Sequence, residues 1–255
     1  MGICGTAITL GSVEVFRWKK YEVTTKLPSG YTPVEYLQSS GTQYVKTGVY
    51  HNSTTCPTLR MVLDVELSGS ICINGTASYQ SYYVGLMNSY LYYSTYHADV
   101  ITTVAYSTAT RYKYDLDNAA KSFSIYSPNG ASVYSTSTTV GTPEGNRELY
   151  LFAYSNADSG SVGAYCNQKM YACQLYSGGA LVRDFSPCVN ASGTIGLYDL
   201  VNDVFYANNG SGTFIAGAES ENIAVGDFIE EVKSLNANAY PNGGIQDGYY
   251  YERAV

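Results

Sequence analysis

Charged residues are scarce in this sequence. Its 255 residues include 14 Lys or Arg and 21 Asp or Glu, which is 14% of the chain, and the net charge is −7. The only local basic run is Arg17, Lys19 and Lys20, which is too short to line a groove for a phosphate backbone. We therefore expect no nucleic-acid partner. A disordered chain is also excluded, because it would carry more charge and fewer aromatic residues.

Patterns for zinc binding and catalysis are missing as well. The chain has 2 His and 6 Cys with no Cys-x-x-Cys pair, so we expect no zinc site. The nucleophile motif Gly-x-Ser-x-Gly is absent. Asp64 and Glu66 share one face of a predicted strand, but the glucan-hydrolase pattern Glu-x-Asp-x-x-Glu is absent and a solvated strand face explains them. The sequence therefore predicts a protein that is not an enzyme.

Signals for membranes and secretion are not found either. No apolar run is long enough to span a bilayer, and Met1–Leu10 lacks the basic start and the apolar length of a signal peptide. Met1–Thr6 fits the short N-myristoylation pattern, which is common by chance. No heptad repeat specifies a coiled-coil stalk. We expect neither lipidation nor membrane insertion.

Tyrosine, glycine and small polar residues are abundant. The chain has 28 Tyr and 25 Gly, and Ser, Thr and Asn supply most of the polar surface. This neutral, aromatic composition is typical of β-rich recognition surfaces and of extracellular or virion proteins. A chain of this length can bury one sizeable core, and single all-β sandwiches often reach it.

Alternation of apolar and polar residues predicts β-strands along most of the chain. In Leu59–Leu67 the odd-numbered residues form an apolar face and the even-numbered residues a mostly polar one. Lys169–Tyr176 and Leu181–Phe185 alternate in the same way on either side of a turn at Gly178–Gly179. Only Gly226–Lys233 offers a turn or two of helix. Many short strands at this spacing predict an all-β fold, a two-sheet antiparallel jelly-roll sandwich.

Two segments resemble a known domain family. The first, Leu27 to Val49, reads LPSGYTPVEYLQSSGTQYVKTGV, and the second, Lys169 to Gly217, begins KMYACQLYSGGALVRDF. They are similar to the opening and closing motifs of laminin-G-like, concanavalin A-like jelly-roll domains in tail and surface proteins of phages and prophages of Gram-positive gut bacteria. The resemblance covers roughly residues 27 to 217 and implies a concanavalin A-like sandwich.

The resemblance divides the chain into three parts. Residues 27–217 would form the concanavalin A-like sandwich, residues 1–26 an N-terminal extension with a strand, and residues 218–255 a Tyr-rich C-terminal segment. We expect the two flanks to form a small β module, with the sandwich inserted between them. Alternatively, the flanking strands lie across the sandwich as edge strands.

Tyrosines concentrate between residues 79 and 96. Sugar sites use aromatic ring faces and planar polar groups, and exposed Tyr supplies such surface at low entropy cost. Consecutive pairs such as Tyr82–Tyr83 place one ring on each face of a strand, so we expect some rings to face solvent. The alternative is that these rings fill the core and cover a β-surface. The candidate ligand-binding residues are Tyr82, Tyr83, Tyr90, Tyr92, Tyr93 and Tyr96.

Three polar loops are candidates for a structural Ca²⁺, and we expect no other cofactor. Laminin-G-like sandwiches often hold Ca²⁺ at a loop rim through carboxylate and carbonyl oxygens. Each loop is also what an ordinary turn would carry, because Asp and Asn satisfy backbone groups there. The candidate ligands are Asp115, Asp117 and Asn118 in the first loop, Asn156 and Asp158 in the second, and Asp199, Asn202 and Asp203 in the third.

The resemblance implies a non-enzymatic virion structural protein, in a tail, a fibre or a surface decoration, that adheres to host-surface or mucosal glycans. Its expected partners are other virion proteins and further copies of itself. One alternative is a purely structural capsid or baseplate component without glycan binding. Another is a bacterial surface adhesin.

The implied location is the virion surface, after assembly in the bacterial cytoplasm. In that reducing compartment we expect mostly free, buried thiols. A bridge between Cys166 and Cys173 is disfavoured, because their odd spacing places them on opposite faces of a strand.

Overall fold

The computed structural model describes residues 2–10, 13–21, 27–53, 56–68, 71–77, 82–87, 90–95, 99–105, 110–139, 141, 147–156, 161–220, 245–246 and 249–253. The chain divides into two compact units, one made of Met1–Pro28 with Glu221–Val255 and the other of Ser29–Ser220. Every regular element in the described ranges is a β-strand, as the sequence predicts. None of these ranges contains a helix long and apolar enough to cross a membrane.

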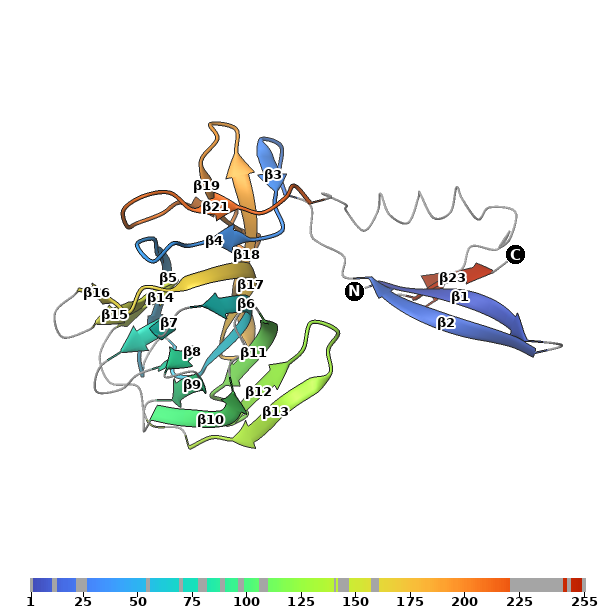
Figure 1. Cartoon of the computed structure of the whole chain (residues 1–255), viewed down its shortest axis with the longest axis horizontal. Helices are drawn as coiled ribbons and strands as arrows, with labels where there is room; N and C mark the ends of the chain where they lie inside the picture. Colours follow the sequence, from blue (N-terminus) through green and yellow to red (C-terminus); the bar gives the residue numbers. More distant parts are fainter. Residues whose placement is uncertain are drawn as a thin grey trace. The chain divides into compact units, whose positions relative to one another are not determined.

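The two ends of the chain share a four-stranded sheet in the order β2-β1-β23-β22 (Figure 1). β1 pairs antiparallel with β2, and β23 runs parallel to β1. The helical turn expected at Gly226–Lys233 lies outside the described residues. The strands of this sheet are β1 (Gly2–Leu10), β2 (Val13–Tyr21), β22 (Ile245–Gln246) and β23 (Tyr249–Arg253).

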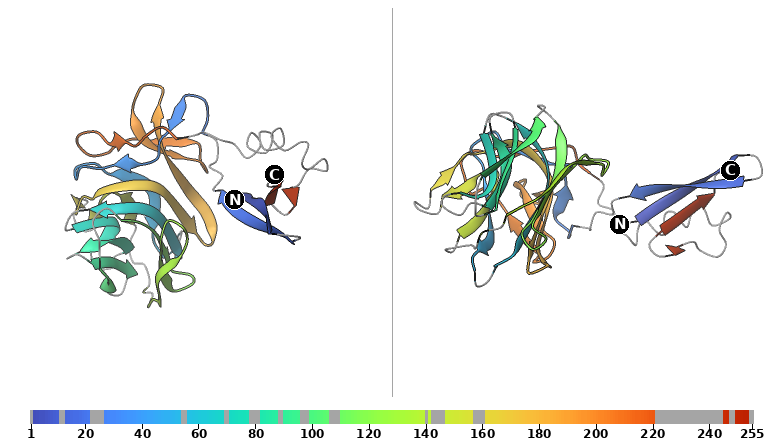
Figure 2. Two further views of the ribbon diagram at one scale, coloured as in Figure 1. Left: turned by 45° about the vertical axis from the view of Figure 1, so that its right-hand side comes forward. Right: turned by 90° about the horizontal axis from the view of Figure 1, so that it is seen from below.

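The second unit contains two sheets that face each other (Figures 1 and 2). The first sheet has eight strands, and its main path runs β10-β9-β8-β7-β14-β5 with antiparallel neighbours. β15 joins it parallel to β7 and antiparallel to β16. Its strands are β5 (Val45–His51), β7 (Ile71–Ala77), β8 (Tyr82–Met87), β9 (Tyr90–Thr95), β10 (Asp99–Ala105), β14 (Arg147–Leu151), β15 (Tyr154–Asn156) and β16 (Val162–Gly163).

The second sheet has eleven strands, with the main order β13-β12-β11-β6-β17-β18-β19-β20. The hairpin of β17 and β18 turns at Gly178 and Gly179, which both adopt the positive φ that glycine tolerates best. The strands are β3 (Tyr31–Pro33), β4 (Leu37–Gln38), β6 (Leu59–Ser68), β11 (Arg111–Asp117), β12 (Ser122–Tyr126), β13 (Ser132–Ser137), β17 (Asn167–Ser177), β18 (Ala180–Asn190), β19 (Ile195–Asp199), β20 (Val204–Tyr206) and β21 (Ile215–Ala216).

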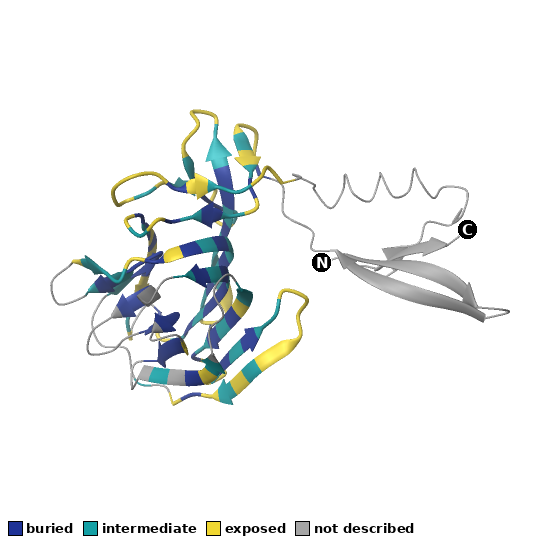
Figure 3. Ribbon diagram, in the orientation of Figure 1, coloured by how far each residue is buried: buried dark blue, intermediate teal, exposed yellow. Residues whose placement is uncertain are grey.

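The core lies between these two sheets and consists of the inward residues of each strand (Figure 3). β6 is its clearest element, because its odd-numbered residues are all fully buried while Arg60, Asp64 and Glu66 on the other face are partly exposed. Alternation with one buried face is what a sandwich strand requires. The predicted all-β sandwich is thus confirmed.

Three of the four cysteines whose side chains are described fit the expectation of mostly free thiols. Cys56, Cys173 and Cys188 are free and buried, as predicted. Cys166, however, is disulfide-bonded. A disulfide depends on which cysteines meet in space, and neither sequence spacing nor an assumed compartment supplies that information.

Candidate functional site

Tyr82 and Tyr93 lie in the sandwich core. The Tyr82 hydroxyl donates to the main-chain oxygen of Leu116 at 2.7 Å, and the Tyr93 ring stacks on Phe123 with centroids 4.2 Å apart. Both rings are buried, so neither offers a face to a ligand. The expectation that these two tyrosines belong to an exposed surface is wrong, because their sides of β8 and β9 face the core.

Tyr83 and Tyr92 point to the opposite face, as alternation predicts, but they are buried there too. Their rings stack with centroids 5.5 Å apart, and Tyr154 packs against them. Their expected exposure is therefore also wrong, since neighbouring rings cover one another. Tyr90 stays at the surface, 43% exposed, and Tyr96 lies outside the described residues.

The first predicted calcium loop is occupied by an ion pair. Asp115 accepts hydrogen bonds from Arg60 Nε at 2.8 Å and from Arg60 Nη2 at 2.6 Å. Asp117 lies 3.6 Å from Arg60 Nε and accepts the Ala120 N–H at 2.9 Å. Protein donors thus contact both carboxylates. Across the residues that the structure describes, no group of three or more His, Cys, Asp or Glu is arranged to hold a metal ion.

The second calcium loop is only partly described. The main-chain N–H of Asn156 donates to the carbonyl of Ser161 at 2.8 Å and closes the loop between β15 and β16. Asp158 lies outside the described residues, so this metal site stays a prediction.

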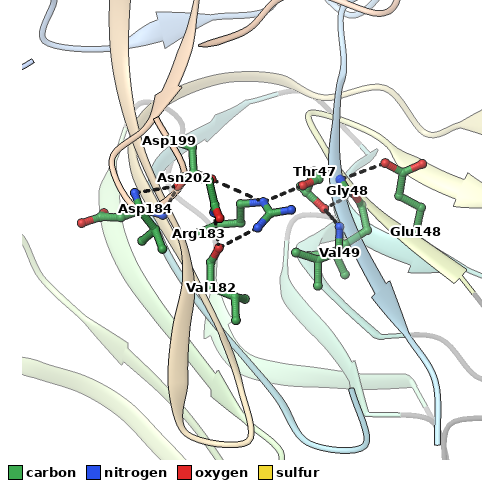
Figure 4. Close-up of polar contacts among 11 residues, drawn as sticks. Thr47, Gly48, Val49, Glu148, Val182, Arg183, Asp184, Asp199 and Asn202 are labelled. Carbon is green, nitrogen blue, oxygen red and sulfur yellow. Dashed lines mark hydrogen bonds and ion pairs between the residues drawn. The ribbon is translucent and has the colours of Figure 1, made fainter. Parts of the chain in front are cut away.

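In the third loop, Asp199 acts as an internal hydrogen-bond acceptor (Figure 4). It is fully buried, and its carboxylate accepts from the N–H of Asp184 at 3.0 Å, the N–H of Val201 at 3.1 Å and Asn202 Nδ2 at 2.7 Å. Arg183 Nε lies 3.5 Å away and supplies the opposite charge. Arg183 thus pairs with a carboxylate from the neighbouring strand and not with the adjacent Asp184.

Asp64 and Glu66 lie on the outer face of the eleven-stranded sheet, each beside a cation. Arg111 donates to Asp64 through Nε at 2.6 Å and Nη2 at 2.7 Å, and Lys169 Nζ lies 3.0 Å from Glu66. The Arg111 guanidinium also lies 3.8 Å above the Tyr171 ring. The cations of this face thus cover ring surface that a ligand would need.

A more open aromatic surface runs along β5 and β14, on the outer face of the other sheet. We call it the tyrosine strip. Its rings include two of the most exposed in the described chain, Tyr50 at 44% and Tyr165 at 37%. The strip consists of Tyr44, Lys46, Tyr50, Glu148, Tyr150 and Tyr165.

The strip is one connected surface. The Tyr44 ring lies 5.2 Å from Tyr150 and 6.2 Å from Tyr165, measured between centroids. Lys46 Nζ lies 5.8 Å above the Tyr150 ring. At the other end, the Tyr50 hydroxyl donates to Glu148 Oε2 at 3.4 Å. The exposed rings of Tyr50 and Tyr165, one ammonium and one carboxylate therefore lie on one surface, while the Tyr150 ring is buried.

A bulge in β5 holds the strip in place. Glu148 lies opposite Tyr50 and Tyr150 opposite Lys46, so three residues of β5 face one of β14. Inside the bulge, the Gly48 N–H donates to Glu148 Oε1 at 2.9 Å, which fixes the carboxylate beside Tyr50.

Arg183 supports this bulge from the opposite sheet (Figure 4). Its Nε donates to the carbonyl of Thr47 at 2.9 Å while it also faces Asp199. Gly48 has φ +68°, and a Cβ there would lie 3.1 Å from Arg183 Nη2. The positive φ and this close approach both favour glycine where β5 passes the guanidinium.

The strip has the chemistry of a saccharide-binding surface. Tyrosine rings can pack on the C–H face of a sugar, while Lys46 and Glu148 can donate to and accept from its hydroxyls. The pKa of Lys46 is raised, chiefly by Tyr150 and next by Tyr44.

Sequence reasoning did not single out this surface. Buried and exposed residues alternate along β5. That signal is short, and the other half of the strip comes from residues about 100 positions further along the chain. The dense tyrosine run between residues 79 and 96 was the stronger pattern, but four of its rings, those of Tyr82, Tyr83, Tyr92 and Tyr93, are buried.

No family model matches the chain, and no curated protein is similar to it in sequence. Among solved structures, the chain is similar to one described as a "putative carbohydrate binding protein from Bacteroides ovatus ATCC 8483". The identity is 12% and the TM-score is 0.49, over 85% of this chain and 68% of that one.

Proposed function

We propose that this protein is a non-enzymatic component of a phage virion, in the tail, a fibre or a surface decoration. In this proposal it attaches the particle to host-surface or mucosal glycans through the tyrosine strip. It acts at the virion surface, alongside other virion proteins.

The observation that carries the adhesion proposal is the exposure of Tyr50 and Tyr165 on either side of Lys46 and Glu148. Rigid aromatic groups beside a fixed carboxylate lower the entropy cost of binding, because Glu148 is already held by the Gly48 N–H. Four of the six residues, Lys46, Tyr50, Glu148 and Tyr150, lie on the paired strands β5 and β14, which position side chains better than free loops do.

The virion setting is supported by the sequence resemblance of Leu27–Val49 and Lys169–Gly217 to phage tail and surface domains. The lack of catalysis is supported by the placement of Asp64 and Glu66, since each is paired with its own cation. In a retaining or inverting hydrolase the two carboxylates would instead share one substrate.

The test is binding of the purified full chain to a glycan array, with and without a calcium chelator. Tyr50→Ala and Tyr165→Ala should each abolish a hit or weaken it at least ~10-fold, as loss of a stacking ring in a binding site does. Tyr90→Ala is the matched control, because Tyr90 is equally exposed but lies on β9, three strands from β14.

Each outcome separates the alternatives. Loss of binding in both strip variants, with the Tyr90 variant unchanged, supports the proposal. Loss only in the Tyr90 variant would move the site to the β8–β9 region. A blank array with folded protein would contradict glycan adhesion and favour a purely structural virion role. Loss on chelation would place a calcium-dependent site elsewhere, because the strip contains a single carboxylate.

A further inference from the structure

β13 is a bare edge of the eleven-stranded sheet. It pairs only with β12, and its other side carries no partner strand in the described chain. Its six residues, SVYSTS, include no charge and no proline, and four of them are exposed. Charges, prolines and covering loops are the usual devices that keep an edge from pairing with another chain. β13 therefore lacks the protection of charge and proline, although its pairing with β12 shifts register at Val133.

The edge strand β5 shows what a protected edge looks like in this protein. Asn208 Oδ1 accepts the N–H of Tyr44 at 3.1 Å, and Asn209 Oδ1 accepts the N–H of Lys46 at 2.9 Å. Arg183 covers the next carbonyl, that of Thr47. Side chains thus occupy several backbone groups of β5 that another strand would need, whereas along β13 the described side chains reach one, the Ser137 carbonyl, which accepts from Thr136 Oγ1 at 3.3 Å.

We propose that β13 pairs antiparallel with β13 of a second copy of this chain, about a two-fold axis at Ser135. An isologous contact requires a surface that is complementary to itself. An uncharged strand meets this condition, because pairing with its own copy brings no like charges together. The two eleven-stranded sheets would then join into one continuous sheet.

The face of each side chain limits the register to axes that pass through a residue, and Ser135 is the exposed residue nearest the middle of β13. Tyr134 and Thr136 point inward, since they pair with Ile125 and Phe123 of the core. An axis at Ser135 places Tyr134 of one copy opposite Thr136 of the other, which keeps inward residues on the inward face. An axis between two residues would place inward side chains opposite outward ones and is excluded.

The contact is small, so the association should be weak and concentration-dependent. One short strand pair buries less than the roughly 1,200 Å² of a standard specific interface. Copies held side by side in a larger assembly would pair far more completely, because their effective concentration is high. Pairing of β13 between two copies does not depend on glycan binding.

The test is sedimentation equilibrium of the full chain over a wide concentration range. The wild type should shift from monomer to dimer as concentration rises. Ser135→Lys and Ser135→Glu should each remain monomeric, because two like charges would meet at the axis. An equimolar mixture of the two variants should regain the dimer. Circular dichroism should show that both variants fold, since Ser135 is exposed.

Thr103→Lys is the matched control, because Thr103 is an exposed residue on β10, the edge strand of the other sheet. This variant should dimerise like the wild type. A wild type that stays monomeric throughout would overturn the proposal. So would a Ser135→Lys variant that still dimerises, a Thr103→Lys variant that does not, or a mixture of charge variants that stays monomeric.

Discussion

Asn74 of β7 and Gln168 of β17 exchange two hydrogen bonds across the middle of the sandwich. Asn74 Nδ2 donates to Gln168 Oε1 at 2.9 Å, and Gln168 Nε2 donates to Asn74 Oδ1 at 2.9 Å. Both side chains are buried, and Asn74 Oδ1 also accepts the N–H of Phe152 at 2.7 Å. One amide comes from each sheet, so the pair fixes how the two sheets face each other.

Replacing one amide alone should be costly. Asn74→Leu would leave the buried Gln168 amide and the Phe152 N–H without these partners, and we expect a loss of about 2–4 kcal/mol in the free energy of unfolding. The double variant Asn74→Leu/Gln168→Leu should lose less than the sum of the two single variants. Urea unfolding of all four proteins measures this coupling. Additive losses would show that the two amides act independently.

His51 should make stability fall in acid. Burial lowers its pKa from 6.5 to about 3, so the folded protein holds it neutral while the unfolded chain takes up a proton below pH 6.5. The contribution of His51 to the free energy of unfolding is fully present above pH 6.5. It is lost as the pH falls from 6.5 toward 3, by about 1.4 kcal/mol per pH unit.

The matched variant is His51→Phe, which keeps a ring beside Tyr82, whose centroid lies 5.7 Å from that of His51. Between pH 7 and pH 4.5, the wild type should lose about 2–3 kcal/mol more than the variant in urea unfolding. Equal losses would show that His51 does not titrate in this way.

Alanine variants at Gly48 and Gly178 distinguish the cost of backbone strain from the cost of a steric contact. Both have positive φ, but a Cβ at Gly48 would meet Arg183 Nη2 at 3.1 Å, whereas nothing lies within 4 Å at Gly178. We expect Gly178→Ala to cost about 1 kcal/mol and Gly48→Ala about 1–2 kcal/mol more. Thermal unfolding compares the two variants. Equal costs would mean that the guanidinium moves aside freely.

Arg183 should matter to both stability and binding. Arg183→Met removes the donor to Thr47 and leaves the buried Asp199 carboxylate without its cation, and we expect a loss of about 3 kcal/mol. Arg183→Met/Asp199→Asn should recover part of it. Because Arg183 holds the β5 bulge, both variants should also bind glycans more weakly than the wild type. Unchanged binding in a folded Arg183→Met protein would contradict this positioning role.

An Arg111 variant tests whether the outer face of the eleven-stranded sheet takes part in binding. Its ion pair with Asp64 is partly solvated, so Arg111→Met should cost only about 1 kcal/mol or less. Glycan binding should not change, because the tyrosine strip lies on the other sheet. If array binding were lost in this variant, the outer face of the eleven-stranded sheet would be the binding surface instead.

The sequence by itself determined the class of fold and the direction of many side chains. The alternation in Leu59–Leu67 leaves only one way to bury its apolar residues, and β6 buries them all. The Gly178–Gly179 pair specified the hairpin of β17 and β18 in the same local way. Alternation also placed Tyr82 and Tyr83 on opposite faces of β8, as the structure confirms.

Only the tertiary structure decided which polar and aromatic groups reach solvent. Tyr83 points outward, yet it is buried beneath its stacked neighbour Tyr92, because burial depends on what packs above a sheet and not on the strand alone. The tyrosine strip joins residues 44–50 with residues 148–165, and the Cys166 disulfide likewise depends on contacts in space. Local periodicity carries no information about such long-range pairing, since it is set by sheet order and register.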